Sequence, residues 1–137
     1  YYRDQQMRRL LALDLAHRSE DDRAIYQALN QLALDLYAAW LHQLPNPKLR
    51  RLSFIEWLYH ALQDPALSEA DLRAAFQHYL RSLAQAIGHD HNDPPLTAWI
   101  ENQLRADPEI IYLVQHRWGE DGLATLISWL APAPSSE

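Results

Sequence analysis

The chain contains very few of the side chains that favour β-strands. Of its 137 residues only ten are β-branched: seven Ile, two Thr and one Val. Such residues suit the pleated, half-buried surface of a sheet. Leu and Ala instead contribute 24 and 19 residues, and both favour helices. We therefore expect an all-α protein, and the absence of Cys excludes a disulfide scaffold.

Prolines, glycines and capping residues divide the chain into seven predicted helices. The first covers about 2–17 and the second 20–43; the third begins at the capping box Ser53-Phe54-Ile55-Glu56, the fourth at Ser68, the fifth at Pro94, the sixth at Pro108 and the seventh at Asp121. We expect a compact bundle of six or seven helices over 1–130, followed by a Pro/Ser-rich tail or linker at 131–137. The alternative is a short α-solenoid, because Trp precedes a Pro stop three times, although the spacings are unequal.

The second predicted helix carries the longest apolar seam of the chain. Ile25, Leu29, Leu32, Leu36 and Trp40 follow one another at spacings of three and four. The fourth helix has the cleanest 3.6-residue stripe. We therefore expect the second and fourth helices to pack near the centre of the bundle.

The charge balance restricts the class of partner. Twelve Lys and Arg oppose eighteen Asp and Glu, which gives a net charge of −6. This balance disfavours non-specific nucleic-acid binding, which requires neutralisation of phosphates. No apolar run reaches the eighteen residues of a membrane span, and no signal peptide is visible. We expect a cytoplasmic protein. The start at Tyr1-Tyr2 and the Pro/Ser tail are typical of a domain cut from a longer protein or of trimmed termini, and the alternative is a complete small protein with disordered ends.

One polar loop offers a candidate metal site. His89, His91 and Asp93 present imidazoles and a carboxylate within five residues, a donor set that suits a divalent ion, with His60 or His78 as a further ligand. The competing interpretation is a plain loop between two helices in which Asp93 is an N-cap. No cofactor-binding signature accompanies it.

A second motif concerns catalysis. The segment from Arg73 to His78 resembles the R-x4-H signature of HEPN-type ribonucleases, which are helical bundles that often dimerise to bring two such motifs together. The resemblance covers six residues and implies that Arg73 stabilises a phosphate and that His78 transfers a proton. The family usually has a polar residue after the Arg, where this chain has Ala74. The alternative is a surface Arg and a half-buried His on an amphipathic helix.

Three of the five Trp residues lie in the last forty positions. Trp and Tyr are core residues that are also enriched at binding hot spots. We expect Trp99, Trp118, Trp129 and Tyr112 to contribute to a partner-binding groove. The sequence thus favours a non-catalytic helical interaction or regulatory module that binds a protein or a neighbouring domain of the same chain. The alternatives are a HEPN-like ribonuclease and a metal-binding domain, and the oligomeric state is open.

Overall fold

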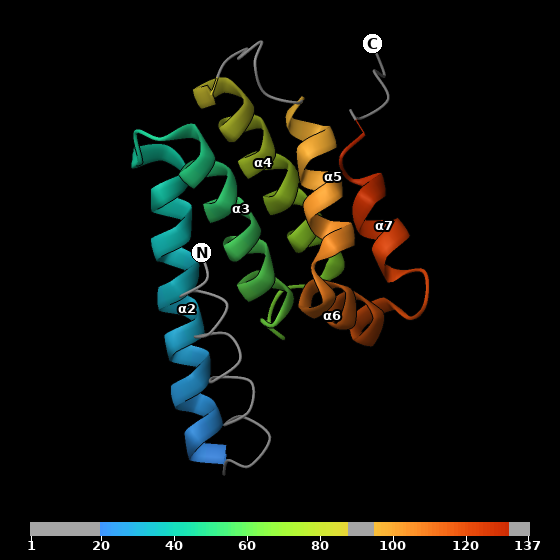
Figure 1. Cartoon of the computed structure of the whole chain (residues 1–137). Coiled ribbons are helices and arrows are strands. Elements are labelled where there is room, and N and C mark those ends of the chain that lie inside the picture. Colours follow the sequence, from blue (N-terminus) through green and yellow to red (C-terminus); the bar gives the residue numbers. More distant parts are fainter. Residues whose placement is uncertain (1–19, 88–94, 132–137) are drawn as a thin grey trace.

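The helix α3 (Pro47–Leu62) is buried along most of its length, and other helices surround it. Every residue from Ser53 to Leu62 is buried, the polar ones included. In the computed structural model, which describes residues 20–87 and 95–131, α3 contacts four other helices. The centre of the bundle is therefore α3 and not, as the sequence predicted, the second and fourth helices (Figure 1).

Six helices account for nearly all of the described residues. They are α2 (Glu20–Gln43), α3, α4 (Glu69–Ile87), α5 (Leu96–Ala106), α6 (Pro108–Trp118) and α7 (Gly122–Ser128). No strand occurs in the described ranges, so the all-α prediction is confirmed. The contacts of α3 with α6, and of α5 with α7, join helices that are not neighbours in the chain, as in a compact bundle. None of the helices within 20–87 and 95–131 is sufficiently long and apolar to span a bilayer.

The third predicted helix begins six residues earlier than expected. Asn46 is its N-cap: the side chain accepts hydrogen bonds from the backbone N–H groups of Lys48 at 2.8 Å and Leu49 at 3.4 Å. Pro47 occupies the first turn, where its missing N–H costs nothing. Ser53, predicted to be the cap, lies inside the helix and donates to the carbonyl of Leu49 at 2.8 Å. Asn46-Pro47 is thus both the stop of α2 and the start of α3.

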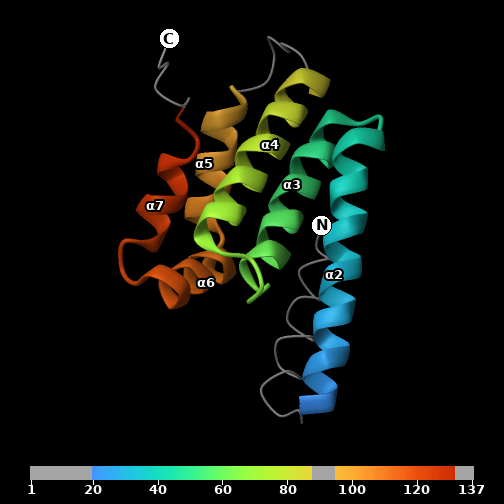
Figure 2. The ribbon, with the colours of Figure 1, turned by 180° about the vertical axis from the view of Figure 1, so that it is seen from behind.

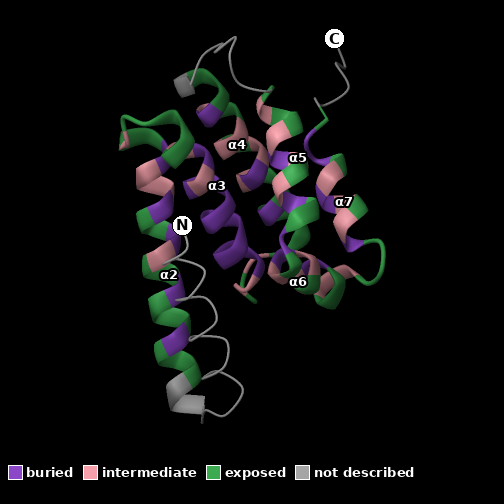
Figure 3. Cartoon of the chain, viewed as in Figure 1, coloured by how far each residue is buried: buried purple, intermediate pink, exposed green. Residues whose placement is uncertain are grey.

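The helix α2 lies at the edge of the bundle in both views (Figures 1 and 2). Its buried apolar side chains are Tyr26, Leu34, Tyr37 and Leu41, which belong to a stripe different from the predicted seam. The seam from Ile25 to Leu36 is exposed, so the prediction that it forms the core was wrong. The sequence of α2 carries two apolar stripes, and the one with the cleaner spacing faces away from α3 (Figure 3).

An aromatic chain connects the two halves of the core. Phe54 of α3 meets Phe76 of α4 at 5.2 Å between ring centroids, and Phe76 meets Trp129 at 5.6 Å. Trp129 in turn meets Trp118 at 5.3 Å. All three contacts are edge-to-face, the arrangement that the ring quadrupoles favour. This chain of rings adds to the direct contacts that α5 and α6 make with α3.

Two glycines at the α6–α7 connection have different physical roles. Gly119 has φ of +86° and ends α6, with its N–H donating to the carbonyl of Gln115 at 2.8 Å. Gly122 begins α7, and a Cβ atom there would lie 2.2 Å from the carbonyl oxygen of Val114. Gly119 therefore supplies a backbone conformation, whereas Gly122 supplies space.

We predict that Gly119→Ala costs about 1–3 kcal/mol in the free energy of unfolding, because φ of 86° with ψ of −165° is a conformation that essentially only Gly adopts. Gly122→Ala is expected to cost a similar amount, about 1–3 kcal/mol, because α7 must move away from α6. Urea denaturation followed by circular dichroism measures both, with Ala124→Ser on the exposed side of α7 as the control. A Gly122→Ala variant as stable as the parent would contradict the close approach.

Candidate docking surface

The exposed large hydrophobic side chains concentrate on α2. Within the described residues six such side chains are exposed, namely Ile25, Leu29, Leu32, Leu36, Leu49 and Tyr112. The first four lie on α2, and we call them the α2 outer face. Leu32 is the most exposed of the four, at 64%. Isolated exposed Leu residues are ordinary, but a group on one helix marks a candidate contact surface.

The α2 outer face is a narrow, straight stripe. Its residues are separated by four, three and four positions, which at 3.6 residues per turn places them within about 60° of the helix circumference. The stripe is about 16 Å long at 1.5 Å per residue. Ala28, also exposed, lies beside it and leaves room for a close neighbour. Of the other described helices, α3 and α4 contact α2, and they do so on its buried side.

A buried polar pair fixes the rotation of α2 about its axis. The side-chain amide of Asn30 donates to the backbone carbonyl of His60 at 2.9 Å, and its oxygen lies 2.7 Å from Nδ1 of His60. Because an amide oxygen only accepts, Nδ1 carries the proton. Both residues are buried, and the ring of Tyr37 stacks on His60 with centroids 5.7 Å apart. Rolling α2 to bury its outer face would break both hydrogen bonds.

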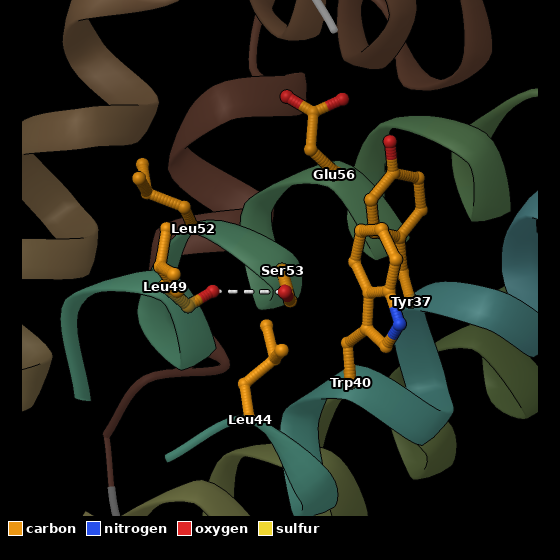
Figure 4. Close-up of a pocket in the computed structure, with 7 residues that line it drawn as sticks. All are labelled: Tyr37, Trp40, Leu44, Leu49, Leu52, Ser53 and Glu56. Carbon is orange, nitrogen blue, oxygen red and sulfur yellow. Dashed lines mark hydrogen bonds between the residues drawn. The ribbon is translucent and has the colours of Figure 1, made fainter. Parts of the chain in front are cut away.

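An apolar pocket of about 200 Å³ lies between α2 and α3, toward the C-terminal end of α2 (Figure 4). Its lining comes from both helices: Tyr37, Trp40, Leu44, Leu49, Leu52, Ser53 and Glu56. Trp40, partly buried, meets Tyr37 edge-to-face at 5.5 Å. Trp40 follows Leu36 by one helical turn, so the pocket continues the α2 outer face. Its volume suits a single apolar side chain.

Arg73 and His78 do not converge in one chain. Both are exposed on α4. Five positions on a helix differ in direction by about 140°. Arg73 borders a shallow hollow together with Glu69, Ala70, Ala74 and Gln77, which His78 does not line. The ring of His78 instead lies 5.1 Å from that of Tyr79. The HEPN interpretation stays a prediction.

The four aromatic residues predicted to bind a partner are placed in different environments. Trp129 is buried in the core, and Trp118 and Trp99 are partly buried. The guanidinium carbon of Arg51 lies 5.6 Å from the ring centroid of Trp99. Tyr112 is 66% exposed and stacks on His116. Of the four, Tyr112 is thus the one with a freely accessible ring, and a shared binding role stays a prediction.

The predicted metal ligands His89, His91 and Asp93 lie outside the described residues. The two histidines predicted as a further ligand lie in different environments, because His60 is buried in α3 and His78 is exposed on α4. Among the residues that the structure describes, no group of three His, Asp or Glu side chains is arranged to hold a metal ion.

Comparisons of the chain with protein-family models, with curated proteins and with solved structures find no match. The assignment of a function therefore depends on the surface geometry described above.

The phenol of Tyr26 provides a test of how α2 is attached. Tyr26 donates a hydrogen bond to the side-chain oxygen of Gln63, at the end of α3. Burial raises the pKa of Tyr26 above its ordinary value of about 10. The folded state therefore holds this proton more tightly than the unfolded chain does. Its contribution to stability is complete below pH 10 and is lost as the pH rises through the folded-state pKa.

We predict that Tyr26→Phe lowers the free energy of unfolding by about 1 kcal/mol at neutral pH, since the hydrogen bond is lost. The stability of the variant is expected to fall less steeply than that of the parent above pH 10. Urea denaturation at several alkaline pH values measures the slope, with Tyr112→Phe as an exposed control. Equal slopes for the parent and Tyr26→Phe would show that the phenol is not buried against α3.

Proposed function

We propose that this chain is a helical protein-interaction module that binds an amphipathic helix of a protein partner on the α2 outer face. The observation that carries the proposal is the exposed stripe from Ile25 to Leu36 on a helix whose rotation is fixed. Laying the apolar face of one helix on another is a common mode of recognition, with anchors at spacings of three and four.

The size of the stripe supports the proposal. Its four side chains expose on the order of 400 Å², within the range of about 300–600 Å² for the largest apolar patch of a typical monomer, which is often functional. Each side chain is already about half covered, and burying the remaining area of about 100 Å² contributes on the order of 2 kcal/mol apiece before the costs of association. The pocket beside Trp40 adds a place for one anchoring side chain.

Charge favours a protein over a membrane surface or a nucleic acid as the partner. The sequence of α2 contains four acidic residues and one Arg, and the chain as a whole carries a net charge of −6. Anionic lipid headgroups and phosphates attract basic surfaces and are repelled by acidic ones. The stripe itself carries no charged side chain, so an amphipathic helix can contact it through apolar side chains while its own charges stay in water.

A photoreactive benzophenone amino acid at position 32 tests the proposal in cells that express the full chain. We expect adducts with one or a few proteins, because residue 32 lies at the middle of the stripe. Leu29→Asp, one turn away, is expected to reduce the adducts at least tenfold, since it places a charge in the apolar contact.

The same photoreactive group at position 115 is the control, because Gln115 is also exposed but lies on α6 and in no predicted binding site. Adducts that are equally abundant at the two positions, or that persist in the Leu29→Asp background, would contradict a specific docking surface on α2.

A further inference from the structure

The spacing of the α2 outer face is complementary to itself. A second α2 can be laid antiparallel to the first in a register in which Ile25 faces Leu36 and Leu29 faces Leu32. The two-fold axis that relates the copies repeats both contacts, so each pair occurs twice. We propose that the helix bound on this face is α2 of a second copy of the chain. This inference rests on the proposed function and names the partner.

The local geometry suits a two-stranded helix pair. Spacings of four, three and four are those of a coiled-coil seam, in which each apolar side chain enters a hole formed by the facing helix. Ala28, exposed beside the seam, allows the axes to approach to the usual 8–10 Å. Since Asn30 and His60 hold the seam outward, α2 meets its copy without rearrangement.

The charges of α2 favour the antiparallel over the parallel pair. The first three residues of α2 are acidic, and His42 lies in its last turn. Parallel helices would bring the two acidic ends together and align the macrodipoles side by side. An antiparallel pair instead keeps the two acidic N-terminal ends apart and sets the two macrodipoles in opposite directions.

The available area sets the strength of the dimer. Two copies of the stripe, with the flanking small residues, bury on the order of 1,000 Å² in total, at the lower limit for a specific interface. We therefore expect a reversible dimer with a Kd in the micromolar range, so that the average mass in solution rises with protein concentration. Such a dimer leaves the pocket beside Trp40 at the end of the pair.

Sedimentation equilibrium of the full chain from about 1 to 500 µM tests the pairing. The average mass is expected to rise from one copy to two over this range. Leu32→Asp is expected to raise the Kd at least a hundredfold, whereas Gln115→Asp at an exposed position of α6 is expected to leave it unchanged. Because Leu32 is exposed, its replacement is expected to leave the thermal melting temperature of the monomer unchanged.

The orientation is measured separately, without altering the seam. The chain has no Cys, so Gln43→Cys, at the exposed last residue of α2, accepts a single spin label. In the antiparallel pair the two labels lie about 40 Å apart, whereas in a parallel pair they lie within about 20 Å. If the two labels lie within about 20 Å of each other, and Leu32→Asp still dissociates the dimer, the antiparallel arrangement is wrong.

The two proposals can fail independently. A parent chain that stays monomeric at every concentration overturns the dimer, and so does a dimer that Leu32→Asp does not weaken. If the photoreactive group at position 32 then still captures a different protein in a Leu29-dependent manner, the docking function stands. If the parent chain stays monomeric and position 32 gives no Leu29-dependent adduct with any protein, both proposals fail.

Discussion

The burial of α3 imposes a condition on the helices around it. A helix buried along most of its length must find partners for its polar groups within the protein, because an unpaired buried group costs several kcal/mol. Nε of Arg51 has no hydrogen-bond partner among the described residues, and its guanidinium lies against the ring of Trp99. His60 meets this condition through Asn30 of α2, and Ser53 through the carbonyl of Leu49. The carbonyl of Leu62, at the end of α3, accepts from the guanidinium of Arg117 at 3.0 Å. These partners come from different helices, so satisfying α3 also positions α2 and α6.

The sequence predicts helix content and most of the helix ends because those depend on local chemistry. Gly119 and Asp107-Pro108 separate α6 from its neighbours as expected, since a positive φ and a proline in the first turn act within a few residues. Ser53 misled the prediction because a capping box and an ordinary helical turn have the same composition. The decisive residue was Asn46, whose side chain reaches two backbone N–H groups.

The candidate site was visible in the sequence but was given the wrong role. The stripe of Ile25, Leu29, Leu32 and Leu36 is as regular as any core stripe, and regularity alone does not say which of two apolar faces meets the core. The answer depends on Asn30, a polar residue in the other stripe, whose partner His60 lies thirty positions away. Periodicity measures how apolar a face is, whereas the buried hydrogen bonds decide which way it points.

The fixed rotation of α2 has a consequence for the rate of association. A surface that already has its bound conformation loses little conformational entropy on contact. Its encounters with a partner are therefore limited by diffusion and orientation, in the ordinary range of about 10⁵–10⁷ M⁻¹s⁻¹. Two copies of this acidic chain also repel each other at a distance, so added salt should quicken their encounter by screening that repulsion. Because the Asn30–His60 pair fixes the surface in advance, changes in the four side chains of the α2 outer face are expected to alter the dissociation rate of a complex more than its association rate.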